Sequence, residues 1–364
     1  MAEASDSRGD VTPVFGLTKA QLRPIVGNIV PDEPVASFDV AIEHQVQGFC
    51  GYSAEKAIPS FTYTTKSGRI GRTTIFIKWF YRSDPAEAHH YAYLQKHHAP
   101  IPRMYGVLTG PDGREMLFLE YLDPIGDVQA CENFLDDPDH FRQLLAVTAR
   151  FNAIQPSGEY AAGLPRKGVG EGLMDACATL ERIWEHACKG DLGNALRQLC
   201  SSSQEGLPQL QMLARSLIEP ISRMETGLIH SDIYPENTGW RRETRELLIL
   251  DLEWIGFGPR FYDAASLLGA PDDLQPHWQR REELAQYYLE QYVRWGGPAV
   301  SLDQFMKEVP VLWAAQRLNI MWFGLRHALD GRVDWTEDRE EGRRFFREEL
   351  YKHLSVLLRE GSKG

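Results

Sequence analysis

Cysteine is scarce in this sequence, and its few copies form no pattern. The 364 residues contain five cysteines, and no two of them lie in a Cys-x-x-Cys pair. An odd number of scattered cysteines argues against a disulfide framework and against a zinc site. We therefore expect a reducing compartment and predict a cytoplasmic protein.

Long apolar runs and basic runs are missing as well. No apolar stretch approaches the length of a membrane span, and the polar, acidic first ten residues predict no signal peptide. Lys and Arg number 39 against 51 Asp and Glu, which gives a net charge of −12. Such a chain is expected to bind neither nucleic acid nor an anionic membrane. The sequence gives no indication of an oligomeric state.

What is present is an ordinary globular composition, with 43% hydrophobic and 25% charged residues. The length exceeds one compact core and predicts two lobes. Residues 1–34 carry four prolines and little periodicity, so we interpret them as an extension. Residues 35–122 are predicted to form a β-rich, nucleotide-binding N-terminal lobe. Residues 123–364 are predicted to form a mainly helical C-terminal lobe for catalysis and substrate binding.

The fold class follows from two kinds of periodicity. Residues 61–65 and 73–80 are rich in β-branched and aromatic side chains and flank a Lys-Ser-Gly-Arg turn, which predicts a β-hairpin. Residues 116–121 indicate another strand. Later segments, such as 141–154, show the helical spacing of apolar residues. The sequence thus predicts an α+β fold with a small antiparallel sheet followed by a larger helical region.

The segment 227–269 carries the most informative chemistry. Asp232 closes a His-Ser-Asp triplet, Asn237 follows five residues later, and an apolar run delivers Asp251 at its end. This order and spacing is the one that phosphoryl transfer uses in kinases. Asp232 is predicted to be the catalytic base, and Asn237 and Asp251 are predicted to bind Mg²⁺ against the phosphates of ATP or GTP. Each residue alone would be interpreted as a turn or strand-end residue, but the set favours catalysis.

The upstream strands offer candidates for nucleotide binding. Lys78 lies inside an apolar strand, and Glu87 follows on a helix that opens with Asp-Pro, so the two are predicted to pair and to place a lysine on the phosphates. A solvent-facing lysine on an edge strand and a surface Glu are the alternatives.

Three residues of a glycine-containing segment and two at the end of the N-terminal lobe complete the predicted nucleotide site. Gly48, Gly51 and Ser53 lie where a phosphate-binding loop is expected, although glycines there could also form a simple turn. Glu120 and Leu122 are predicted to lie at the hinge, where backbone groups would meet the nucleotide base.

The sequence resembles the aminoglycoside phosphotransferase/choline kinase family, the small-molecule relatives of protein kinases. The resemblance rests on the segments HSDIYPENTGW, ILDLEWIGFGPRFYDAASL and IFIKWF. It implies a protein-kinase-like bilobal fold and a kinase that transfers the γ-phosphoryl group of ATP or GTP to the hydroxyl of a small molecule. It also implies that Asp263 braces the catalytic loop and that His230 supports it. Ser231 departs from the family's usual Gly, and the glycine loop is diffuse.

The acceptor is the least defined part of the prediction. Glu253, Asp272 and Asp273 are tentative substrate residues, and their charge, together with the net charge of −12, favours a neutral or cationic hydroxylated acceptor. An amino sugar, an amino alcohol or a choline-like compound would fit. Alternatively, Asp272 and Asp273 belong to an exposed Pro-Asp-Asp turn without a ligand role.

Two other functions compete with an active kinase. One is a catalytically silent kinase-like protein that binds a nucleotide or a partner; the complete set of Lys78, Asp232, Asn237 and Asp251 speaks against it. The other is a hydrolase that uses His230 and Ser231. The chain lacks a Gly-x-Ser-x-Gly turn at Ser231, and a Ser directly beside its His is poorly placed for a proton relay.

Overall fold

The computed structural model describes residues 11–46, 54–81, 86–110, 112–126, 128–187, 203–270 and 280–329. The chain divides into two compact units. The first comprises Met1–Glu132 and Tyr234–Glu253, and the second comprises Asn133–Ile233 and Trp254–Gly364. The stretch Tyr234–Glu253, which follows Asp232 in the chain, therefore groups with the N-terminal sheet. The lobe boundary after residue 122 remains a prediction.

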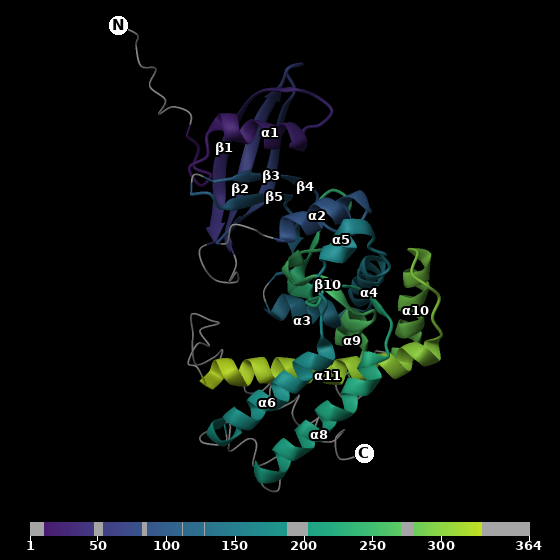
Figure 1. Ribbon diagram of the computed structural model, residues 1–364. Coiled ribbons are helices and arrows are strands. Elements are labelled where there is room, and N and C mark those ends of the chain that lie inside the picture. The colour runs from purple at the N-terminus through teal and green to yellow at the C-terminus, as the bar shows by residue number, and fades with distance from the viewer. Residues whose placement is uncertain are drawn as a thin grey trace. The chain divides into compact units, whose positions relative to one another are not determined.

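The first unit is built on a five-stranded antiparallel sheet in the order β1-β2-β3-β5-β4 (Figure 1). The β2–β3 pair is the hairpin that the sequence predicts, and helix α2 follows it. The bounds of these elements are β1 Val35–Val46, β2 Ala54–Thr65, β3 Ile70–Phe80, α2 Ala86–Lys96, β4 Met104–Thr109 and β5 Glu115–Glu120.

Helix α1 (Lys19–Ile29) packs against this sheet (Figure 1). A capping box between Thr18 and Gln21 begins the helix, since each side chain bonds the other residue's backbone N–H. Leu22, Ile25 and Val26 are buried in a hydrophobic cluster with residues of the sheet. The interpretation of residues 1–34 as an extension missed this helix, because its apolar residues cover only two turns and lie among prolines.

A second, three-stranded sheet in the first unit has the order β6-β8-β9. Its strands are β6 Asp123–Pro124, β8 Thr238–Trp240 and β9 Leu247–Ile249, and the 3₁₀ turn η2 Pro235–Asn237 precedes β8. Gly239 lies so close to Leu122 that an added Cβ would come within 2.9 Å of the leucine Cβ. Only glycine therefore lets the β8–β9 hairpin approach the end of β5 this closely.

The second unit is mainly helical and has one short two-stranded sheet, β7–β10. Helix α10 packs against α4, while α11 packs against α6, α8 and α9 (Figure 1). Edge-to-face contacts surround Phe261, whose ring centroid lies 4.8 Å from that of Phe305. The bounds are α4 Pro138–Asn152, α5 Gly158–Gly163, α6 Val169–Ala187, α8 Ser203–Ser222, β7 Thr226–Ile229, β10 Gly256–Pro259, α9 Tyr262–Leu268, α10 Arg281–Arg294 and α11 Leu302–Leu329.

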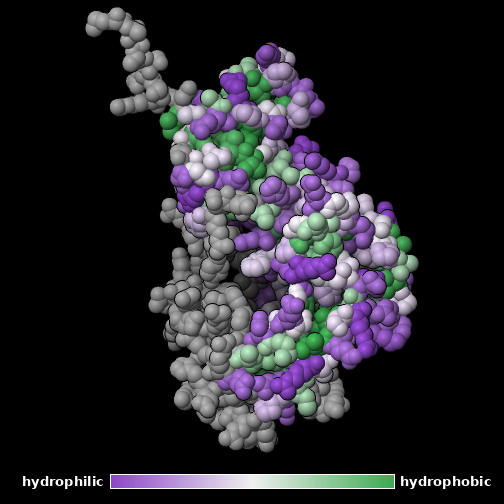
Figure 2. Space-filling view, in the orientation of Figure 1, coloured by the Kyte–Doolittle hydropathy of each residue, from purple (hydrophilic) through white to green (hydrophobic). Residues whose placement is uncertain are grey.

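Two short elements cross the division between the units, α3 Val128–Asp136 and the 3₁₀ turn η3 Leu252–Trp254. Hydrophilic side chains cover much of the described surface on the face that Figure 2 shows. In the part of the chain that the structure describes, none of the helices combines the length and hydropathy needed to cross a membrane.

The buried face of α1 is expected to contribute to stability. Ile25→Ala should lower the free energy of unfolding by about 2–5 kcal/mol, because it leaves a cavity under the helix. Gly27→Ala is the matched control: a Cβ there meets no atom within 4 Å, so the change should be neutral or stabilise by about 0.5–1 kcal/mol. Urea unfolding of both variants checks this, and equal effects would show that α1 does not contribute its apolar face to the core.

Candidate active site

A cavity of about 210 Å³ lies within the first unit. Strands β2, β3 and β5 form one wall. Helix α2, the segment after β5 and residues on either side of the β8–β9 hairpin contribute the rest. The lining combines an apolar part with a charged part. The apolar part includes Ile58, Phe76, Leu119, Leu122 and Leu250, and the charged part includes Lys56, Lys78, Glu120, Glu236 and Asp251.

Lys78 forms a buried ion network at the charged end of this cavity. Its Nζ donates to both carboxylate oxygens of Glu87, at 2.8 and 2.9 Å, and to Oδ1 of Asp251 at 2.8 Å. The Lys78 and Glu87 side chains are 5% and 1% exposed, whereas that of Asp251 is 29% exposed. Glu87 Oε1 also accepts the backbone N–H of Leu252 at 3.1 Å. One lysine thus joins β3, α2 and the segment that follows β9.

Burial and charge act against each other in this network. Burial alone would lower the pKa of Lys78, but the attraction of Glu87 and Asp251 outweighs it, so the pKa lies above its ordinary value. Burial raises the pKa of Glu87, and the attraction of Lys78 does not fully offset this effect. Burial also raises the pKa of Tyr91, and the negative charges of Glu87 and Asp251 add to the shift.

The β8–β9 hairpin brings Asn237 and Asp251 to one end. The backbone N–H of Leu250 donates to the carbonyl of Asn237 at 2.8 Å, so the two residues flank the base of the hairpin. Both line the cavity. Asp251 has a φ of 59°, in the left-handed region that a non-glycine residue adopts at a cost of about 1–2 kcal/mol. This backbone turn places the carboxylate of Asp251 on Lys78.

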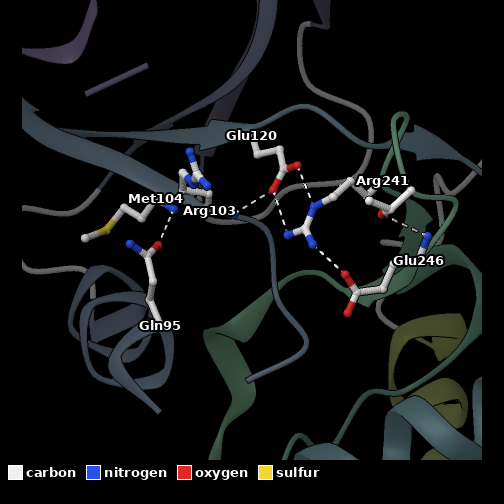
Figure 3. Close-up of polar contacts among 7 residues, drawn as sticks. Gln95, Arg103, Met104, Glu120, Arg241 and Glu246 are labelled. Atoms are coloured by element: carbon white, nitrogen blue, oxygen red, sulfur yellow. Dashed lines mark hydrogen bonds and ion pairs between the residues drawn. The ribbon is translucent and has the colours of Figure 1, made fainter. Parts of the chain in front are cut away.

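The turn end of the β8–β9 hairpin is tied to the end of β5 by Arg241 (Figure 3). Its Nε and Nη2 donate to the two carboxylate oxygens of Glu120, at 2.8 and 3.1 Å, and its Nη1 donates to Glu246. Glu120 also accepts the backbone N–H of Arg103 at 3.0 Å. The bidentate pair therefore fixes the end of β5 to the hairpin that carries Asn237 and Asp251. The side chain of Glu120 is thus engaged by protein groups.

In the second unit, Asp263 holds the His-Ser-Asp segment by its backbone. Its Oδ2 accepts the N–H of His230 and its Oδ1 accepts the N–H of Ser231, both at 2.8 Å. Asn152 donates to the same Oδ2 at 2.7 Å, and Tyr288 donates to Asn152 Oδ1 at 2.9 Å. This network is buried, so it defines the backbone path just before Asp232.

Asp232 itself is half-buried, and its backbone N–H donates to Nδ1 of His230 at 3.3 Å. His230 is fully buried and packs edge-on against Phe151, which suits a supporting role rather than a nucleophilic one. Ser231 has a φ of 74°, the conformation for which the family's usual glycine is best suited. The Ser231 hydroxyl finds no hydrogen-bond partner among the described residues, so nothing there supports a hydrolase relay.

Several predicted site residues lie outside the described residues, namely Gly48, Gly51, Ser53, Asp272 and Asp273. Glu253 is exposed and lies in the turn η3 beside Asp251 in sequence. Leu122 is buried and lines the cavity, next to Glu120. Functional roles for all of these remain predictions.

The donor set at the base of the hairpin suits Mg²⁺. Among the residues that the structure describes, no group of three or more His, Cys, Asp or Glu side chains could hold a metal alone. Mg²⁺ in nucleotide sites is usually held by one or two protein oxygens together with substrate phosphates. Asn237 and Asp251 supply oxygens of this kind on the cavity wall, so they fit a metal that arrives with the nucleotide.

Sequence reasoning missed four side chains, Arg241 and Lys56 in the first unit and Asn152 and Tyr288 in the second. Arg241 lies in a charged turn, where arginine is ordinarily solvent-exposed. Asn152 offers the clearest signal, because it is a polar residue on a mostly apolar helical face. Lys56 follows residues 47–53, the segment whose glycines predict the phosphate-binding loop.

Comparison with known proteins places these observations in a family context. The model of the phosphotransferase enzyme family matches residues 74–301. A Ralstonia eutropha protein assigned as an aminoglycoside phosphotransferase is 13% identical, with a TM-score of 0.54 over 92% of this chain and 98% of that chain. The ethanolamine kinase of Plasmodium vivax is 12% identical, with a TM-score of 0.54 over 86% and 83% of the two chains.

An amicoumacin kinase, solved with AMP-PNP and Ca²⁺, is 16% identical, with a TM-score of 0.50 over 85% of this chain and 89% of that chain. No curated protein matches the chain by sequence. At these identities the likeness concerns the fold. The predicted protein-kinase-like fold, with an antiparallel sheet in the N-terminal region and helices in the C-terminal region, is confirmed.

The buried ion network predicts a specific pH dependence. Lys78→Met removes the attraction that lowers the pKa of Glu87. Burial and the negative charge of Asp251 remain, and both raise this pKa above the unfolded value near 4.5. A carboxyl with a raised folded pKa binds more protons when folded, so stability falls as pH rises above the unfolded value and through the folded pKa. The free energy of unfolding of the variant should be about 3–5 kcal/mol lower than that of the wild type at neutral pH. Part of this difference should disappear as the pH approaches the unfolded pKa of the carboxyl.

The measurement is urea unfolding of Lys78→Met between neutral pH and the unfolded pKa of the carboxyl, with the wild type as reference. The double variant Lys78→Met/Glu87→Gln removes the titrating group and should lose the added pH dependence. A Lys78→Met profile that runs parallel to the wild-type profile would contradict the assignment of Glu87 as the buried partner.

The ion pair between Glu120 and Arg241 predicts a measurable coupling of the two residues in stability. A double-mutant cycle of Glu120→Gln and Arg241→Met should give an interaction energy of about 1–3 kcal/mol in unfolding, because the pair is bidentate and mostly buried. The exposed pair Asp303 and Lys307 on α11 is the control and should couple by less than about 1 kcal/mol. A Glu120–Arg241 coupling no larger than that of the control pair would show that Arg241 does not fix the hairpin to β5.

Proposed function

Because the chain belongs to the phosphotransferase enzyme family, we propose that it is a small-molecule kinase that moves the γ-phosphoryl group of ATP or GTP to a hydroxyl group. The observation that carries the proposal is the cavity whose polar end is lined by Lys78, Asn237 and Asp251, with Glu87 buried behind it on Lys78. An apolar slot that leads to a lysine and to oxygen donors suits a nucleotide base followed by phosphates.

Each residue of this site has a proposed role. The base lies in the apolar part of the cavity against backbone groups near Glu120 and Leu122, and Lys78 contacts the phosphates. Asn237 and Asp251 hold Mg²⁺, which would neutralise phosphate charge when it is bound. Asp232 orients the acceptor hydroxyl and accepts its proton as the oxygen attacks the γ-phosphorus, and the nucleoside diphosphate leaves.

The acceptor is proposed to be a neutral or cationic hydroxylated compound, such as an amino sugar, an amino alcohol, a choline-like amine or a sugar. The net charge of −12 and the exposed Glu253 support this class, since carboxylates attract cations and repel anions. Two of the relatives in fold are, by name, an ethanolamine kinase and an amicoumacin kinase.

A catalytically silent protein that binds a nucleotide or a partner is the second candidate. It would share the cavity and the buried Lys78–Glu87 pair, because both support nucleotide binding without catalysis. It would not use Asp232 as a base, because no proton is transferred. Binding and turnover must therefore be measured separately.

Nucleotide binding and catalysis are expected to separate by residue. Mg-ATP or Mg-GTP at about 100 times its Kd should stabilise the protein by about 2.7 kcal/mol, and EDTA should abolish the effect. Asp232→Ala should keep this shift and lower kcat by about 10²–10⁴, because it removes the positioned base. Asp251→Ala should weaken the shift as well. Asp175→Asn, an exposed position on α6, is the control and should behave as wild type.

Thermal unfolding measures the binding, and nucleoside diphosphate release across a panel of cationic, neutral and anionic alcohols measures the turnover. Absence of a shift with either nucleotide would rule out the proposed function. A shift without release for any alcohol would favour the silent alternative. Wild-type turnover by Asp232→Ala would remove Asp232 from the catalytic role.

A further inference from the structure

The cavity of the first unit contains a second lysine that the nucleotide site described above does not use. Lys56 on β2 and Lys78 on β3 are direct partners across the antiparallel pair, and both line the cavity. Residues directly opposite each other on neighbouring strands have their side chains on the same face of the sheet. Both lysines therefore extend from one face into the same space.

The charge balance of the cavity distinguishes the two lysines. Lys78 lies within 2.9 Å of two carboxylates, so the group of Lys78, Glu87 and Asp251 carries more negative than positive charge when all three are ionised. That group cannot by itself attract a polyanion. Lys56 is half-buried and forms no ion pair with any residue of the described ranges. Its neighbour Glu55 pairs instead with Arg114, at 3.8 Å.

A role in sheet stability does not account for Lys56. Like charges directly opposite each other on paired strands destabilise a sheet. The other acidic side chains of the cavity do not compensate Lys56 either, since Glu120 is engaged by Arg241 and Glu236 is exposed. Lys56 brings the summed charge of the two lysines, Glu87 and Asp251 to zero when all four are ionised, so it removes the net negative charge that would repel a phosphate tail.

We propose that Lys56 is a second cationic contact for the phosphate tail of the nucleotide, and that it selects nucleoside polyphosphates over uncharged nucleosides. The inference rests on the proposed function. Lys78 is held in place by its two carboxylates, whereas Lys56 forms no ion pair within the described ranges and is available to a phosphate group. An ammonium group acts on phosphate as a point charge, so its effect grows with the number of phosphates.

The test compares three variants by calorimetry with Mg-ATP, Mg-GTP, Mg-ADP, adenosine and inorganic tripolyphosphate. Lys56→Met keeps the stem and removes the charge, and Lys56→Arg keeps the charge. Lys66→Met removes an equally positive charge from the exposed β2–β3 turn and serves as the control. Lys56→Met should weaken the binding of the triphosphates and of tripolyphosphate about tenfold. It should weaken the binding of Mg-ADP less and leave the binding of adenosine unchanged. Lys56→Arg and Lys66→Met should bind like the wild type.

Each contrary result has a separate meaning. The charge contact is overturned if Lys56→Met binds Mg-ATP as tightly as the wild type. It is also overturned if the substitution weakens adenosine binding as much as Mg-ATP binding; in either case nucleotide binding by the wild type stands. If the wild type binds neither Mg-ATP nor Mg-GTP, the proposed function fails and the role of Lys56 fails with it. Thermal unfolding of Lys56→Met without ligand should stay close to that of the wild type, because Lys56 is half-buried and forms no ion pair within the described ranges. A large loss would assign Lys56 a structural role and overturn the inference.

Discussion

A buried lysine must have its charge compensated, and the first unit is organised around the way Lys78 meets this demand. Removing an ammonium group from water costs several kcal/mol unless carboxylates surround it. Glu87 from α2 and Asp251 from the end of β9 provide them. Strand β3, helix α2 and the β8–β9 hairpin cannot separate without exposing an unpaired charge. The same contacts place a lysine and a carboxylate on the wall of the cavity.

Backbone strain occurs at two positions of the proposed catalytic machinery, and each is compensated locally. Asp251 and Ser231 both have positive φ, which costs a non-glycine residue about 1–2 kcal/mol. At Asp251 the ion pair with Lys78 offsets the cost. At Ser231 the carboxylate of Asp263 accepts the backbone N–H, and Asn152 in turn fixes that carboxylate. In both cases a charged side chain holds the backbone in a conformation that local sequence preference opposes.

The limits of sequence reasoning follow from how far a signal reaches along the chain. The β2–β3 hairpin could be predicted because its periodicity and its turn are local. Lys78 and Asp251 could be singled out because a charged residue inside or after an apolar strand is conspicuous. Arg241 could not, because its role depends on Glu120, which lies more than a hundred residues away. Helix α1 was missed because two turns of apolar residues among prolines give a weak local pattern.

The proposed phosphate contacts in the cavity fall on two lysines whose surroundings differ. A lysine held by two carboxylates is well positioned, because its ammonium group has little freedom left to lose on binding. The same carboxylates cancel its field, so it orients a phosphate better than it attracts one. Lys56 has the opposite properties, since it is more exposed and forms no ion pair with the described residues. Separating attraction from orientation between two opposed residues lets one cavity achieve both.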